Sequence, residues 1–185
     1  KGLAIAGQTT DYEGTSRPTT IAAGCSDIGC DELAAVPPNN PIATVDNPPG
    51  SGVTSTYTLW SRTLLSINWG TGGSSYPTSM NIRYYSGVDP NGVLGGGYSN
   101  SYWEVIPVGS LTGALYNISI YFGGNETFTI STPSSHTRLA KYNGTWEVFS
   151  VAGNGTWQSD LDWPNEIITT RDMNSFSEYA LTDGT

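Results

Sequence analysis

Hydrophobic and polar residues alternate with a period of two along most of the chain after residue 53. The clearest case is residues 114–122, where Tyr116, Ile118, Ile120 and Phe122 alternate with a more polar set. Successive side chains of a strand point to opposite faces of a sheet, so we expect these four residues to face a core. Further short runs, at 57–60, 64–69, 80–85, 102–108 and 127–130, predict more strands joined by tight turns.

The strongest hairpin signal is Asn143-Gly144, which stands between two alternating segments. A type I′ turn needs positive φ at both central residues, and Asn-Gly is a pair that adopts it readily. A last strand near the C-terminus is expected to return to the same sheet. The apolar residues that we expect to supply a buried face of this region are Leu139, Trp146, Val148, Phe149, Phe176, Tyr179 and Leu181.

These patterns predict an all-β fold, an Ig-like antiparallel β-sandwich of about eight to ten strands that spans residues 53–185. Residues 1–52 differ from the rest because they contain few large apolar side chains and cannot form a core of their own. Five prolines between Pro37 and Pro49 favour an extended backbone. We therefore expect an extended N-terminal arm followed by one sandwich domain.

The charge composition of the chain limits the kinds of molecule that it is expected to bind. Only 12% of the residues are charged, the net charge is −9, and the chain has seven Lys and Arg residues in all. Phosphate binding needs a patch of basic residues, so a nucleic-acid partner is not expected. No apolar run approaches the length of a membrane span. Lys1 is not an initiator Met, which indicates a processed chain, and we expect an extracellular or cell-surface location.

Two cysteines, Cys25 and Cys30, are separated by four residues, with a glycine next to each of them. A loop of this length can bring the two sulfurs together, and a disulfide fits an oxidising, extracellular compartment. The alternative is a pair of free thiols. Two cysteines alone do not make a zinc site.

One stretch resembles a known family. Lys141-Tyr-Asn-Gly-Thr-Trp146, followed by Asn174-Ser-Phe-Ser-Glu-Tyr-Ala-Leu181, is similar to the C-terminal β-sandwich region of large secreted surface proteins of Bacteroidota. In that family a Tyr-Asn-Gly-Thr-x-Trp and Phe-Ser-x-Phe-Ala-Leu pattern precedes a type IX secretion sorting signal. Here Trp146 follows Thr145 directly, Tyr179 stands where Phe is commoner, and the sorting signal is absent. The resemblance covers residues 78–183 and implies secretion and surface display, without catalytic residues.

Catalytic and metal-binding groups do not form a recognisable constellation, so we expect no enzyme, cofactor or metal. Glycoside hydrolysis needs two carboxylates, but Glu104, Glu147 and Glu178 each fall inside an alternating strand, where an outward polar residue is usual. His136 is the only histidine, and no Gly-x-Ser-x-Gly motif accompanies it. The calcium-ligand candidates, which turn chemistry explains equally well, are Asp89 with Asn91 and Asp160 with Asp162.

Two further sets of residues are candidates for contact with sugars. Trp157 and Trp163 lie in an irregular segment and are candidates for a carbohydrate-stacking platform, whereas the alternative is that they pack against the core. Four Asn-x-Ser/Thr sequons are candidate glycosylation sites, although Asn-Gly-Thr is also good hairpin chemistry. The sequon asparagines are Asn117, Asn125, Asn143 and Asn154.

The N-terminal arm carries the leading functional hypothesis. Leu3, Ala4, Ile5 and Ala6 form a short alternating segment, which has the form of a strand that completes the sheet of a neighbouring subunit. Repeated head to tail, such a contact does not close and produces a filament. The first hypothesis is thus a secreted structural subunit that polymerises with itself by donating this strand. The alternatives are a carbohydrate-binding or adhesive module that binds surface polysaccharide, and an arm that is merely a linker.

Overall fold

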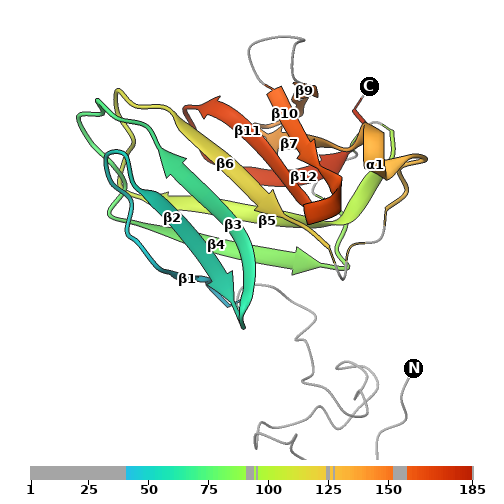
Figure 1. Cartoon of the computed structure of the whole chain (residues 1–185), viewed down its shortest axis with the longest axis horizontal. Coiled ribbons are helices and arrows are strands. Elements are labelled where there is room, and N and C mark those ends of the chain that lie inside the picture. The colour runs from blue at the N-terminus through green and yellow to red at the C-terminus, as the bar shows by residue number, and fades with distance from the viewer. Residues whose placement is uncertain are drawn as a thin grey trace, which may run out of the picture. The chain divides into compact units, whose positions relative to one another are not determined.

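The computed structural model describes residues 41–90, 94, 96–123, 126, 128–151 and 158–184. Within these residues twelve strands form two sheets, nearly all of them antiparallel, so the predicted all-β sandwich is confirmed (Figure 1). Nine of the strands have five residues or more, and the other three have two or three residues each. These three short strands account for the difference from the expected eight to ten.

The larger sheet has seven strands in the order β1-β2-β3-β6-β11-β10-β9. Their bounds are β1 Thr44–Val45, β2 Thr54–Leu59, β3 Arg62–Trp69, β6 Tyr116–Tyr121, β9 Ser150–Val151, β10 Gln158–Asp162 and β11 Ile167–Met173. The pair β9 and β10 is parallel, and the other neighbours are antiparallel.

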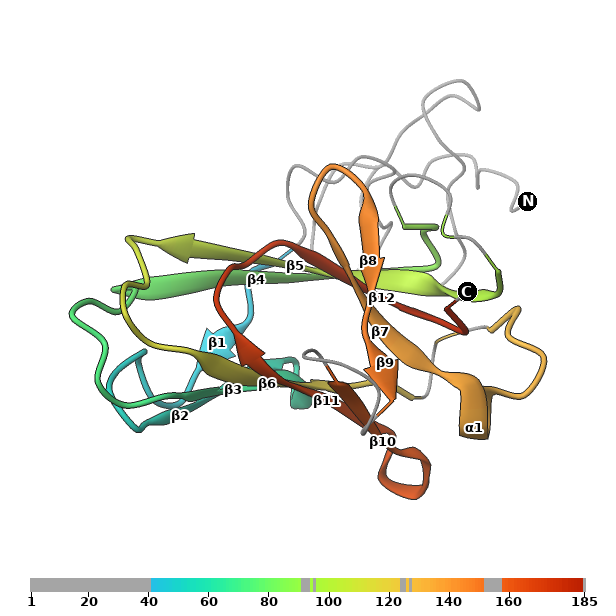
Figure 2. The same cartoon turned by 90° about the horizontal axis from the view of Figure 1, so that it is seen from above.

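The smaller sheet has five antiparallel strands in the order β4-β5-β12-β7-β8. Their bounds are β4 Ser79–Ser86, β5 Tyr98–Val108, β7 Arg138–Tyr142, β8 Trp146–Val148 and β12 Glu178–Thr182. Two short helical turns, α1 at Pro133–His136 and η2 at Trp163–Asn165, join strands. Figure 2, seen from above, shows β4 and β5 as one layer and β2, β3, β6 and β11 as the other.

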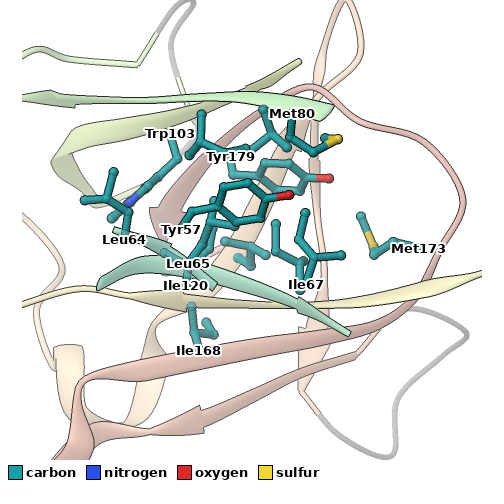
Figure 3. Packing of buried hydrophobic residues seen from close by; sticks show 14 of the residues in the cluster. Tyr57, Leu64, Leu65, Ile67, Met80, Trp103, Ile120, Ile168, Met173 and Tyr179 are labelled. Atoms are coloured by element: carbon teal, nitrogen blue, oxygen red, sulfur yellow. The ribbon is translucent and has the colours of Figure 1, made fainter. Parts of the chain in front are cut away.

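The main core lies between the two sheets, as predicted from the alternation in β6. Tyr116, Ile118, Ile120 and Phe122 are all buried in it. Figure 3 shows side chains from both layers meeting there, among them Tyr57 and Ile67 of the larger sheet and Trp103 and Tyr179 of the smaller one. Burying one such side chain contributes about 1.5–3 kcal/mol, so this core is the main source of stability.

The β7–β8 hairpin occurs where Asn143-Gly144 predicted it, but its turn differs from the predicted type. Tyr142 pairs with Trp146, which leaves a loop of three residues. Gly144 has φ of +78°, whereas Asn143 is not in the positive-φ region. A three-residue loop needs only one left-handed residue, so the prediction of a type I′ turn was wrong.

The last strand returns to the predicted place, since β12 pairs with β7 on one side and β5 on the other. Tyr179 and Leu181 are buried in the main core, as are Leu139 and Phe149. The other three residues of the predicted buried face, Trp146, Val148 and Phe176, are only half-buried.

The sandwich begins earlier than the predicted residue 53. Thr44 and Val45 form β1, which pairs with Thr58 and Tyr57 of β2. Ala43, just before them, is buried in the main core and donates a backbone hydrogen bond to Ile82 of β4 (2.9 Å). Residues 43–45 therefore touch both sheets. The predicted start at residue 53 followed from the proline content of residues 37–49. Pro41, Pro48 and Pro49, however, flank β1 without interrupting it.

Candidate interaction surfaces

Most of the predicted site residues lie outside the described part of the chain. These are the candidate donor strand Leu3, Ala4, Ile5 and Ala6, the cysteines Cys25 and Cys30, the sequons at Asn125 and Asn154, and Trp157. The described candidates are Trp163, Asn117 and Asn143.

Trp163 is half-buried and packs at one end of the core. Its ring centroid lies 5.5 Å from that of Phe122 and 5.9 Å from that of Phe128. It opens the short η2 turn, in which the side chain of Asp162 accepts a hydrogen bond from the backbone N–H of Asn165. One face of the indole is thus used for packing, as in the alternative given above, and a sugar-stacking role for Trp163 stays a prediction.

The two described sequons have different environments. Asn117 is half-buried within β6, a central strand, and its Oδ1 accepts a hydrogen bond from the backbone N–H of Asp172 (3.0 Å). Asn143 is exposed in the β7–β8 turn. Of these two asparagines, Asn143 is the one whose side chain is open to solvent, and glycosylation of either remains a prediction.

One lateral side of the sandwich lies between the edge of β2 and the edge of β4. The chain's own residues 43–46 cross this side. Their backbone pairs with β2 at Thr44, Val45 and Asp46, and with β4 through a single hydrogen bond from Ala43. In an antiparallel ladder the outward backbone groups alternate along a strand. The Ile82 carbonyl points away from β5, so by the same alternation the backbone groups of the exposed Ser86 also point to the β4 edge.

The opposite lateral side is closed in a similar way. Residues 146–151 pass from β8 in the smaller sheet to β9 in the larger one, and Phe149 between them donates a backbone hydrogen bond to Leu139 (2.9 Å). Phe149 is buried in the main core. Each lateral side of the sandwich is therefore crossed by a segment of the same chain. A strand donated by another molecule would extend the edge of a sheet instead of filling a gap in the core.

The β2–β3 turn has an unusual conformation. Leu59 pairs with Arg62, so Trp60 and Ser61 form a two-residue loop, with φ of 47° and 70°. Positive φ at both positions is the requirement of a type I′ turn, which normally selects Asn and Gly. For residues with a Cβ this conformation costs about 1–2 kcal/mol each. Trp60 is nevertheless the most exposed large hydrophobic residue of the described chain, at 78%.

The base of this turn is held by a buried carboxylate. Glu126, whose side chain is 0% exposed, accepts hydrogen bonds from Arg62 (2.7 Å) and from the Tyr84 hydroxyl (2.5 Å) through Oε1. Its Oε2 accepts one from the backbone N–H of Gly123 (2.7 Å). The Arg62 guanidinium also lies 4.7 Å from the centroid of the Tyr84 ring. These contacts tie β3 to β4, and thus one sheet to the other.

The pKa of Glu126 is lowered by these contacts. Burial by itself raises the pKa of the carboxyl, but the hydrogen bonds from Tyr84 and Arg62 and the charge of Arg62 together outweigh that effect. The pKa of Tyr84 is raised, mainly by burial and further by the neighbouring carboxylate. The contacts with Tyr84, Arg62 and Gly123 thus all favour the ionised form of Glu126, which indicates a structural ion pair.

The outer face of the smaller sheet carries a second group of aromatic side chains. Tyr85 of β4 and Tyr102 of β5 are stacked, with ring centroids 4.4 Å apart and an interplanar angle of 8°. Both are buried, and burial raises the pKa of Tyr102 to about 12. They belong to one buried cluster with Leu94, Ala140 and Ala180. These residues form a minor core on the outer face.

A row of polar and aromatic residues crosses the same face beside this minor core. Arg83 and Glu104 form an ion pair at 2.9 Å, and Glu104 pairs across the ladder with Glu178 of β12. Farther along, Tyr142 and Trp146 are half-buried neighbours, with ring centroids 5.2 Å apart. The row therefore places charged groups and partly accessible rings on one sheet face.

The other candidates for chemistry are engaged in ordinary contacts. His136 is exposed on α1, where its ring contacts the hydroxyls of Thr132 and Ser135. Asp160 forms an ion pair with Arg171, and Asp162 caps η2. In the part of the chain that the structure describes, no three His, Cys, Asp or Glu side chains are placed to hold a metal ion. The described helical turns include none long and apolar enough to cross a membrane.

No family model, no curated protein and no solved structure matches this chain.

Proposed function

We propose that this chain is a non-enzymatic structural subunit of an extracellular filament, which polymerises head to tail by donating the N-terminal strand that contains Leu3, Ala4, Ile5 and Ala6. The observation that best supports the proposal is the β4 edge. Among the described residues this eight-residue strand pairs with β5 on one side and receives a single backbone hydrogen bond, from Ala43, on the other. An edge of this kind is a template for an added strand.

The place where the chain enters the sandwich also supports strand donation. Residues 41–43 lead directly to the side between β2 and β4, and forty residues precede them. Those forty residues contain few large apolar side chains, and Pro37 and Pro38 stand at their end, which is the composition of an extended spacer. An arm of this length is sufficient to carry a short strand to a second molecule, because an extended chain spans about 3.3 Å per residue.

Deletion of residues 1–12 tests the donor. We expect the shortened chain to fold with the same thermal unfolding temperature as the full chain, and to remain monomeric at concentrations where the full chain forms filaments. The measurements are circular dichroism, analytical ultracentrifugation and negative-stain electron microscopy. Filaments formed by the shortened chain would show that this segment is not the donated strand.

A proline on the β4 edge tests the acceptor. The exposed Ser86 ends β4 and presents its N–H at the edge, so Ser86→Pro removes that donor while the ladder to β5 remains. We expect Ser86→Pro to fold and to weaken assembly, and the control Ser86→Ala, which keeps the N–H, to assemble normally. Equal assembly of the two variants would place the acceptor elsewhere.

The second candidate function is a carbohydrate-binding or adhesive module. The observation that favours it is the pair of half-buried rings, Tyr142 and Trp146, beside the charged row on the outer face of the smaller sheet. Sugars stack on such rings and bind neighbouring charged groups by hydrogen bonds. In a polysaccharide pull-down, Trp146→Ala should lose binding, while Trp60→Ala, at an exposed tryptophan outside this face, retains it. Binding by both variants would exclude this face.

A further inference from the structure

We propose that Trp60, at the tip of the β2–β3 turn, is an anchor residue of the contact between two copies of this chain. The inference rests on the proposed head-to-tail polymer and names a side chain that this polymer would use in addition to the donated strand. The occupant of the surface is thus a second copy of the same chain.

The first argument is the cost of the turn. Trp60 and Ser61 both adopt positive φ, a conformation that residues with a Cβ avoid, and the largely exposed side chain of Trp60 gains little packing energy within its own molecule. Strained backbone that presents a functional group is a feature of binding sites. Tryptophan is also the residue type most enriched among the side chains that dominate protein–protein contacts.

The second argument is the rigidity of the support. Arg62, the residue after the turn, is fixed by Glu126 and lies over the Tyr84 ring. Leu59 and Arg62 pair at the base of the loop. The backbone of the tip is therefore preorganised, so the turn itself loses little conformational entropy when a partner covers it.

The third argument is location. β1 runs antiparallel to β2, with Thr44 opposite Thr58, so residues 41–43 lie toward the end of β2 that leads into the Trp60 turn. Ile42, in that segment, is itself 46% exposed. If the preceding forty residues reach into a neighbour, this end of the sandwich faces the neighbour as well. Trp60 and Ile42 then lie at the contact, where their apolar surface becomes buried.

The test separates the conformational cost of the turn from its role in assembly. Trp60→Asn combined with Ser61→Gly installs the residue pair that a type I′ turn prefers. We expect this double variant of the full chain to unfold at a higher temperature than the wild type, because the strain is relieved. Its critical concentration for filament assembly should rise by about tenfold or more, as for loss of an anchor residue.

Two single variants complete the comparison. Trp60→Ala, which keeps the backbone strain and removes the ring, should weaken assembly to the same extent as the double variant. Trp60→Tyr, which keeps an aromatic ring, should assemble within about threefold of the wild-type critical concentration. Sedimentation measures assembly, and circular dichroism confirms that each variant is folded.

The outcomes distinguish this inference from the function on which it rests. Assembly of Trp60→Ala and of the double variant at the wild-type concentration, with no assembly after deletion of residues 1–12, would overturn the Trp60 contact and leave strand donation in place. Loss of assembly in both Trp60 variants, with assembly retained after the deletion, would support the contact and contradict strand donation. A wild-type chain that stays monomeric would overturn both.

Discussion

At the scale of single residues, the least expected feature is a carboxylate enclosed between the two sheets. Glu126 is fully buried as a side chain and is paired with Arg62, while the Tyr84 hydroxyl and the Gly123 backbone N–H donate further hydrogen bonds to it. A buried charge is costly unless it is both paired and hydrogen-bonded, and here both conditions are met. Removing the Glu126 carboxylate should therefore lower the stability of the fold.

We predict that Glu126→Gln lowers the free energy of unfolding at pH 7 by roughly 1–3 kcal/mol, the usual effect of weakening hydrogen bonds to a buried charged group. The folded pKa of Glu126 is depressed, so its contribution is present above the unfolded pKa, near 4.5, and is lost as the pH falls through the folded value. The difference between variant and wild type in urea unfolding should thus shrink below pH 4.5.

The matched control is Glu104→Gln, which weakens the partly exposed ion pair with Arg83. Because solvent screens such pairs, we expect a change of less than about 1 kcal/mol at pH 7. A larger effect at Glu104 than at Glu126 would contradict the assignment of Glu126 as the main ionic link between the sheets.

At the scale of elements, the two hairpin loops β2–β3 and β7–β8 place different residue types in the left-handed backbone region. The β7–β8 loop has one glycine in the left-handed region, whereas the β2–β3 loop forces a tryptophan and a serine into it. The first turn is favourable for folding by itself. The second is unfavourable and persists because Arg62 and the paired strands hold it.

We predict that Gly144→Ala destabilises the fold by about 1 kcal/mol, because alanine at φ of +78° is strained. No atom lies within 4 Å of the added Cβ, so the cost is conformational and not steric. In the control Gly50→Ala, φ is not positive and the nearest atom is 3.5 Å away, so the free energy of unfolding should change little. Urea unfolding of both variants measures the contrast, and equal effects would contradict the argument.

At the scale of the whole molecule, the acidic balance of charges affects the proposed contact between subunits. Each chain carries a net charge of −9, so two copies repel one another at low ionic strength. Strand pairing and apolar contact, the interactions proposed between subunits, are not themselves weakened by salt. Screening should therefore favour assembly.

We predict that raising the ionic strength from about 10 mM to about 150 mM lowers the critical concentration of filament assembly, because the screening length falls from about 30 Å to about 8 Å. Sedimentation across a salt series measures this change, and the chain that lacks residues 1–12 should remain monomeric throughout. Assembly that weakens with salt would indicate a contact made by opposite charges instead.

The sequence by itself determined the fold class, the alternating face of β6 and the position of the β7–β8 hairpin, because side-chain alternation and turn residues act over a few neighbouring positions. The family resemblance and the roles of residues 1–40 stay predictions. Only the tertiary structure placed β1 in the sandwich, since a two-residue strand has no period to detect.

Tertiary structure alone also decided that Glu126 is buried and that Trp60 is exposed on a strained turn. No local pattern marks either residue: Glu126 is stabilised by Arg62 and Tyr84, which are 64 and 42 residues away in the sequence. The conformation of Trp60 is imposed by the register of two paired strands against the preference of its own sequence. Long-range contacts can override local preference in this way because the paired strands and the packed core contribute far more free energy than one turn costs.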